Sequence, residues 1–396
     1  MVTNISVFIL SIPPFFKIIN YIYFPEKSHI YQPVIDLFFY FIFIIINKKV
    51  FNTLILIPLY LFVFGSLIGL LNIITSNNDF NFYVIYSALS FLHLISFIAG
   101  CICACKGTLV LYKILLYYSL FDILMAIPRY IHRGTELRSP LGASLLIVPV
   151  IIVILSKQSL FKHWLYYIIP LGIYNVISSG MRSSVVVFFS TLFMSFLYIR
   201  NPNIKRFVKL SSIFVILIIF SLFIPNARNI ASKKINEVEG RLERTIFNRN
   251  NFQIDEDAGR VYESKIAVRS FYSSAELVDI IFGAGYGFTY SEGNDYKTHV
   301  HITYLAWFIR FGIVGQIIYV ILFLSVIGYY FYFFFESRNS NSIILFSIST
   351  FCLSVLIMSL IAGSLIQSMP WFFLGILSQS KKIYNRNNEN IELLLK

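Results

Sequence analysis

The sequence predicts an all-α polytopic membrane protein with about twelve transmembrane helices. Of its 396 residues, 57% are hydrophobic and 13% are charged, whereas soluble globular proteins carry about 25% charged residues. Its mean hydropathy is +0.75. Apolar runs of about 20 residues, long enough to cross a hydrocarbon core, follow one another along the chain. These runs are too long and too evenly apolar for alternating barrel strands, so we expect helices.

The apolar runs also divide the chain into three parts. Nine spans lie in residues 1–225, a hydrophilic loop fills 226–300, and three spans with a tail occupy 301–396. The first run passes through Pro13 and Pro14 without a small-residue cleavage site, so we expect a retained span. The predicted spans are 4–23, 33–47, 52–74, 81–104, 108–127, 141–156, 163–179, 183–199, 208–225, 302–334, 342–361 and 363–379.

The distribution of basic residues predicts the orientation. With both termini in the cytoplasm, the connecting segments and tail on that side hold most of the lysines and arginines, as the positive-inside rule requires. These are Lys48, Lys49, Lys106, Lys157, Lys162, Arg200, Lys205, Arg206, Lys209, Arg338, Lys381, Lys382, Arg386 and Lys396. The short loops on the other face hold Lys27, Arg129, Arg133, Arg138 and Arg182.

In this orientation the 226–300 loop lies outside the cytoplasm. The formal net charge of the chain is +13, but basic and acidic residues nearly cancel within this loop. A nucleic-acid-binding surface would concentrate positive charge there. The sequence therefore indicates no nucleic-acid partner.

Four arginines in the short outer loops stand where positive charge is usually avoided. Arg129, Arg133 and Arg138 share the segment PRYIHRGTELRSP, and Arg182 stands in GMRSS. Arginine binds phosphate through two parallel hydrogen bonds, so an anionic ligand is one explanation. Anchoring to lipid headgroups, or internal ion pairs such as Arg133 with Glu136, are the alternatives.

Apolar positions at helical spacing over 259–282 predict an amphipathic helix on the membrane surface. Arg260 and Arg269 are nine residues apart, so they would point to opposite sides of one straight helix. We expect the helix to end at Gly283 and the following GAGYG to form a tight turn, whose backbone N–H groups could approach an anion. The βαβ context of a dinucleotide site is not present in the sequence.

The histidines and cysteines do not form a metal-binding pattern. His299 and His301 lack a third nearby ligand; either could relay a proton near neutral pH, or both could be surface residues without a role. Consecutive members of the Cys101, Cys103, Cys105 series point about 200° apart around a helix. We therefore expect these cysteines and Cys352 to be small packing residues.

Three motifs in a fixed order resemble a known family. The segments SGMRSSVVVFFSTLFMSFLYI (179–199), FGAGYGF in the outer loop and HITYLAWFIRFGIVGQIIYVILFL (301–324) resemble the bacterial O-antigen polymerase and ligase superfamily, which includes the Wzy-type polymerases. The resemblance covers about residues 175–325. Family members commonly have asparagine after the histidine, whereas Ile302 follows His301 here, so the choice between His299 and His301 stays open.

The resemblance implies a GT-C-like fold and a glycosyltransferase of the bacterial cytoplasmic membrane. It would polymerise O-antigen or capsule repeat units, transferring a glycan from undecaprenyl diphosphate to a sugar hydroxyl outside the cytoplasm. His301 would be the base and Arg182 the second catalytic residue, with Glu263 or Glu276 as reserve bases. By the resemblance Arg260 and Arg269 would bind the diphosphate. The charge distribution adds Arg129, Arg133 and Arg138 to the diphosphate-binding residues, and Arg310 is expected to snorkel at the start of its span. No metal or cofactor is expected; membrane lipids and a chain-length regulator protein are candidate partners.

Three other functions stay open from the sequence. An O-antigen ligase would use the same donor and transfer it to lipid A core. A flippase or transporter for the lipid-linked sugar would need basic cavity residues within its spans and a two-fold repeat. No repeat is visible, and the charges within spans are few: Lys17, Asp36, Lys113, Asp122 and Arg310. A sensor or scaffold without chemistry is the third.

Overall fold

The computed structural model describes two parts of the chain, one on each side of residue 200. The described residues are 2–23, 28–47, 53–75, 78–124, 256–292, 295–297, 300, 302–335, 340–360, 368–380 and 383. The predicted spans 141–156, 163–179, 183–199 and 208–225 lie outside these residues.

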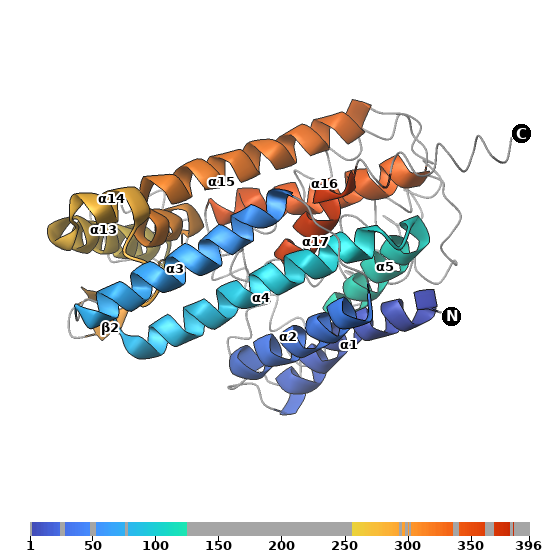
Figure 1. Ribbon diagram of the computed structural model, residues 1–396, viewed down its shortest axis with the longest axis horizontal. Helices are drawn as coiled ribbons and strands as arrows, with labels where there is room; N and C mark the ends of the chain where they lie inside the picture. The colour runs from blue at the N-terminus through green and yellow to red at the C-terminus, as the bar shows by residue number, and fades with distance from the viewer. Residues whose placement is uncertain are drawn as a thin grey trace, which may run out of the picture.

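The described part is a bundle of long helices with a small two-stranded hairpin at one end (Figure 1). Its N-terminal helices are α1 (Val2–Tyr23), α2 (Ser28–Ile46), α3 (Leu56–Ile74, after a 3-10 turn at Thr53–Ile55), α4 (Phe80–Ala104) and α5 (Thr108–Leu124). The remaining elements are α13 (Glu256–Ser274), α14 (Leu277–Phe282), the antiparallel strands β1 (Tyr290–Glu292) and β2 (Asp295–Lys297), α15 (Thr303–Phe335), α16 (Ser340–Ser359) and α17 (Ser368–Ser378).

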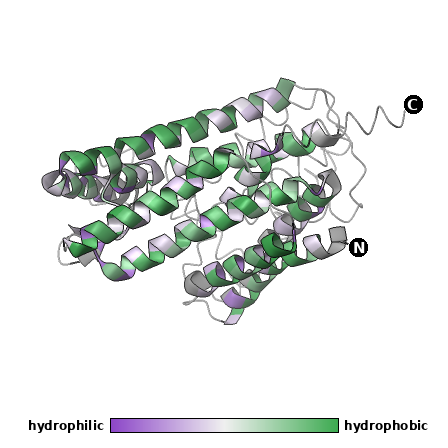
Figure 2. Ribbon diagram, in the orientation of Figure 1, coloured by the Kyte–Doolittle hydropathy of each residue, from purple (hydrophilic) through white to green (hydrophobic). Residues whose placement is uncertain are grey.

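Four of the described helices have the length and apolar composition needed to cross a membrane: α3 with its preceding turn, α4, α15 and the Ser342–Ser359 part of α16. Figure 2 shows hydrophobic residues along most of α3 and α15. Large apolar side chains on both helices are exposed, including Leu67, Ile74 and Leu324. An exposed surface of this kind suits hydrocarbon rather than water, so the prediction of a membrane-embedded helical protein is confirmed at this level.

The helices α4 and α17 cross closely at two glycines. A Cβ added at Gly100 would overlap the Phe372 carbonyl oxygen, and one added at Gly375 would overlap the Phe97 carbonyl oxygen. Small residues let helix backbones approach closely in membrane proteins. Beside this crossing, Trp371 stacks between His93 and Trp307, with ring centroids 5.6 and 6.4 Å apart. The sequence Pro-Trp-Phe-Phe therefore fills the centre of the bundle.

The predicted single helix over 259–282 is wrong in one respect, because it is broken into α13 and α14. Glu276 adopts an extended conformation (ψ 171°) and begins α14 through a capping box with Asp279, which starts a new helix. The helix ends at Gly283 as predicted. Gly283 has a positive φ of 86°, but its ψ of 172° leads into an extended segment rather than a left-handed turn.

Candidate functional site

The glycine-rich loop Gly283–Gly287 is packed against α3, the first turn of α4 and the start of α15. It lies at the end of the bundle where α13, α14 and the hairpin meet α3 and the start of α15 (Figure 1). Its amides are used internally: Ala284 N donates to Ile309 O at 2.8 Å, Gly285 N to Arg310 O at 3.0 Å, and Tyr286 N to Gly65 O at 3.0 Å. The idea that N–H groups of this loop approach an anion is therefore wrong for these three amides.

Side chains at the end of α3 and in the α3–α4 connection donate to carbonyl groups of the same loop. Asn72 Nδ2 donates to Ala284 O at 2.7 Å, and Asn78 Nδ2 donates to Tyr286 O at 2.6 Å. The backbone of Asp79 donates to Gly287 O at 2.9 Å, while its carboxylate caps α4. The loop is thus fixed by Ile309 and Arg310 at the start of α15 and by residues of the α3–α4 region more than 200 positions earlier in the chain.

The side chain of Tyr286 lies between α3 and α4. Its hydroxyl donates to Leu61 O at 3.0 Å and is hydrogen-bonded to Ser90 Oγ. Gly65 lies nine residues before the end of α3, about 13 Å along the helix at 1.5 Å per residue. Irregular backbone is tolerated at such depth when it is enclosed by protein and its polar groups are paired. Burial raises the pKa of the Tyr286 phenol, and the Arg310 guanidinium partly opposes the shift.

Arg310 is buried inside this arrangement, with 9% of its surface exposed. Its guanidinium carbon lies 3.8 Å from the centroid of the Tyr86 ring, and Tyr86 in turn stacks on Tyr286 at 6.2 Å. Stacking of this kind is a cation–π interaction that strengthens when water is excluded. The predicted snorkelling of Arg310 at its helix start is therefore wrong.

A kink at Gly312 follows the buried Arg310 in α15. Gly312 adopts φ 60° and ψ −154° inside α15, which turns the first nine residues of the helix away from the axis of the rest. A Cβ at this position would lie 2.6 Å from Ile280 O, so the kink is packed directly on α14. Glycine permits both the positive φ and the close contact.

A second buried polar contact joins α13 and β1. Glu263 on α13 is 6% exposed and accepts a hydrogen bond from Tyr290 Oη at 2.6 Å. Tyr290 belongs to a cluster of buried apolar residues that also includes Phe271 on α13, Val300, and Ile309 on α15. Of the two reserve bases, Glu263 is thus enclosed, whereas Glu276 is exposed and uses its side chain to cap α14.

Most of the predicted site residues are not described by the structure. Arg129, Arg133, Arg138, Arg182, His299 and His301 lie outside the described residues. Arg260 and Arg269 both belong to α13, which is unbroken between them. The Arg269 side chain is exposed.

A separate polar network connects α1, α2 and α17. Gln32 Nε2 donates to Asp36 Oδ1 at 2.6 Å and to Pro13 O at 3.1 Å, and Ser368 Oγ donates to Asp36 Oδ2 at 2.6 Å. One turn further along α2, Tyr40 and Tyr118 share a buried hydrogen bond of 3.0 Å. Ionisable groups within apolar helices are rare and usually paired in this way.

Neither the cysteines nor the acidic residues of the described part assemble a metal site. Within the described ranges, no three His, Cys, Asp or Glu side chains come together. Cys101, Cys103 and Cys352 are buried and Cys105 is half-buried, in agreement with the predicted packing role.

Comparison with known proteins adds no assignment: no protein-family model matches the chain, and no curated protein is similar to it. The motif resemblance therefore stands on the quoted residues alone. Sequence reasoning missed Tyr86 and Ser90 as neighbours of the loop, because an aromatic and a serine in an apolar helix carry no distinguishing pattern. For Arg310 a signal was available, since a charge inside a predicted span is unusual.

Proposed function

We propose that this protein is a polysaccharide repeat-unit polymerase of the bacterial cytoplasmic membrane. It would transfer a glycan from undecaprenyl diphosphate to a sugar hydroxyl of an acceptor glycan on the outer face, without a metal ion. The observation that supports this most is the buried Arg310, stacked on Tyr86 beside the packed glycine loop. The Arg310 guanidinium is a permanent positive charge in low-dielectric surroundings, within the segment that resembles the family.

The chemistry explains why such an arginine matters. The diphosphate gains negative charge as the glycosidic bond breaks, and a preorganised cation stabilises that state more than it stabilises the bound donor. Stacking on Tyr86 uses the face of the Arg310 guanidinium, and guanidinium groups bind phosphate through N–H donors that lie in their plane. His301 remains the proposed base and Arg182 the proposed second arginine of this reaction.

The test is reconstitution with a lipid-linked repeat unit, followed by mass analysis of the products. The wild-type protein should yield larger oligosaccharides. Arg310→Gln should lower the rate by about 10²- to 10³-fold, as loss of one preorganised charge does, and Arg310→Lys should recover part of it. Lys265→Gln, which removes an exposed charge from α13, is the matched control. Full activity in a folded Arg310→Gln protein would refute the role of this residue.

The same assay separates the alternatives. Transfer to lipid A core without chain growth would indicate a ligase. Movement of the lipid-linked sugar across the bilayer with no change in mass would indicate a flippase. Of all the features described, the hydrogen-bond network at Asp36 is the one that most favours the flippase, because intramembrane carboxylates frequently belong to transport pathways.

A further inference from the structure

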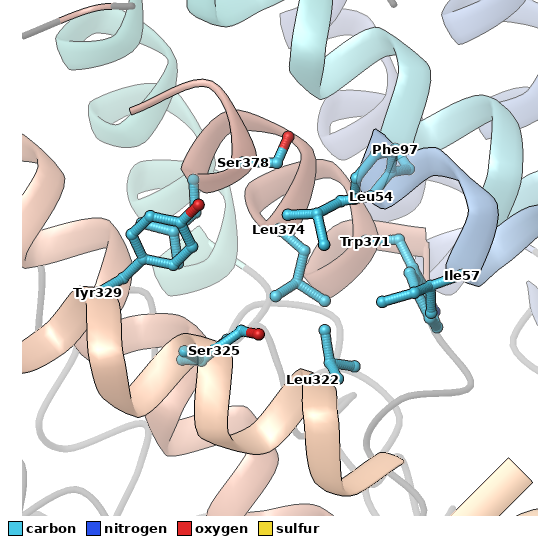
Figure 3. A pocket seen from close by; sticks show the side chains of 11 residues that line it. Leu54, Ile57, Phe97, Leu322, Ser325, Tyr329, Trp371, Leu374 and Ser378 are labelled. Atoms are coloured by element: carbon cyan, nitrogen blue, oxygen red, sulfur yellow. The ribbon is translucent and has the colours of Figure 1, made fainter. Parts of the chain in front are cut away.

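One face of α3 is turned toward the bilayer. Near the start of α3, Leu54 and Ile57 line a small apolar pocket together with side chains of α15 and α17, so protein partly covers that end (Figure 3). Further along the helix, Phe64, Leu67 and Leu71 are exposed. Their spacing of three and four residues places them on one face of α3, which suits contact with hydrocarbon.

The short helix α14 continues this apolar face. The Phe282 ring on α14 and the Phe64 ring on α3 stack with their centroids 6.5 Å apart, and both side chains are exposed. Leu277 and Val278 are 73% and 62% exposed, and they lie with Phe282 in an arc of about 140° around α14. The same arc contains Ile281, so every side chain on this side of α14 is apolar.

The contact with Phe64 shows how far α14 reaches along the span of α3. This span is Thr53–Ile74, whose 22 residues cover about 33 Å of helix, close to the thickness of a hydrocarbon core of about 30 Å. Phe64 lies ten residues inside the Ile74 end, which is about 15 Å. Even if the 6.5 Å between the two rings ran wholly along the axis, Phe282 would lie about 8 Å inside that end. A helix among lipid headgroups would not reach this level.

The glycine loop then leads the chain back out of the span. Gly285 packs on Gly69, five residues inside the same end, and Phe288 pairs with Asn78, which lies beyond the end of α3. All residues of Gly283–Gly287 are buried. Irregular backbone is tolerated at membrane depth where protein encloses it, whereas a helix pairs its own backbone groups and can face lipid. An exposed helix followed by an enclosed loop therefore fits a segment inside the bilayer.

The charged side chains mark where water ends. On α13, Lys265 and Arg269 are exposed, and a charge in hydrocarbon is costly, so this side of α13 suits water. The charges of α14 stand near its start, where Glu276 and Asp279 form the capping box. The boundary between water and hydrocarbon thus falls close to the junction of α13 and α14.

We infer that residues 276–287 form a re-entrant segment, in which α14 enters the hydrocarbon and the enclosed glycine loop returns to the boundary. Leu277, Val278 and Phe282 contact lipid acyl chains directly. The sequence pattern predicts instead an amphipathic helix lying on the membrane surface over 259–282. The inference does not depend on glycan transfer, because it follows from exposure, depth and charge alone.

Collisions of a spin label with oxygen and with a water-soluble nickel complex test the position of α14. Oxygen concentrates in hydrocarbon, whereas the nickel complex stays in water. The label is attached to Val278→Cys or Phe282→Cys, in a protein whose four native cysteines are replaced by alanine and which is reconstituted in phosphatidylcholine vesicles. Leu67→Cys on α3 is the reference for hydrocarbon, and Lys265→Cys on α13 is the matched reference for water.

The ratio of oxygen to nickel collisions should be severalfold higher at Val278 and Phe282 than at Lys265, and close to the ratio at Leu67. A ratio as low as that at Lys265 would place α14 in water and overturn the inference. Few collisions with either reagent at Val278 would also overturn it, because protein, such as a second copy of the chain, would then cover α14.

A second measurement needs no replacement of cysteines. Val278→Lys puts a charge on the exposed side of α14, whereas Val278→Leu keeps that side apolar. In hydrocarbon, the lysine variant should unfold at a lower SDS fraction than the leucine variant, because the charge is costly there. In water the two variants should unfold alike, since lysine and leucine have similar helix propensities. Equal unfolding midpoints would therefore contradict the re-entrant position.

Discussion

The packing of the glycine loop against α3 can be tested at Gly285. Gly285 has φ +73°, and a Cβ added there would lie 2.7 Å from Gly69 Cα and 2.8 Å from the carbonyl carbon of Ile68. Because ordinary contact begins at 3.4 Å, Gly285→Ala forces the loop and α3 apart by at least about 0.7 Å. Gly107 is a matched control, since it has φ +97° and nothing within 4 Å of the added carbon.

Gly285→Ala and Gly107→Ala share two contributions to the free energy of unfolding, and only a third contribution distinguishes them. Both alanines carry the cost of a positive φ, about 1–2 kcal/mol, and both restrict the unfolded chain. Gly285→Ala adds the cost of overpacking, about 1–3 kcal/mol. The free energy of unfolding in mixed micelles, from SDS titration followed by tryptophan fluorescence, should therefore fall further for Gly285→Ala by that amount. Equal losses in the two variants would refute the close docking of the loop on α3.

Two further predictions concern buried polar contacts. Tyr86→Leu should lower the free energy of unfolding by about 0.5–2 kcal/mol more than Tyr86→Phe, because only leucine removes the aromatic face under Arg310; equal values in the same titration would contradict the stacking. Ser368→Ala should cost about 1.5–3 kcal/mol, since its hydroxyl donates to a charged group. The cost should shrink in an Asp36→Asn background, and a double-mutant cycle with strictly additive losses would contradict a direct contact.

The helices of the described part could be predicted because hydrophobicity is a local property. The spans 4–23, 52–74, 81–104 and 302–334 agree closely with α1, α3, α4 and α15. Of the predicted span 363–379, the structure describes the part from Ser368 on, which forms α17 (Ser368–Ser378). In these segments every residue contributes to the same apolar average, so errors at single positions matter little.

The candidate site could be predicted only in part. Gly283 and the irregular GAGYG segment followed from local chain geometry, and they were located correctly. The break at Glu276 was missed because a capping box competes with helical periodicity over four residues. Most of the predicted arginines and both histidines near the outer membrane boundary stay predictions, since they lie outside the described residues.

The sequence by itself determined that this chain is an α-helical membrane protein, because long apolar runs have no other stable backbone arrangement in hydrocarbon. It also determined where the glycine loop interrupts the helices. Only the tertiary structure decided that Tyr286 enters between α3 and α4 and that Arg310 is buried on Tyr86. Those contacts join residues more than 200 positions apart, and no local pattern of hydrophobicity or charge encodes which distant partner a buried polar group will meet.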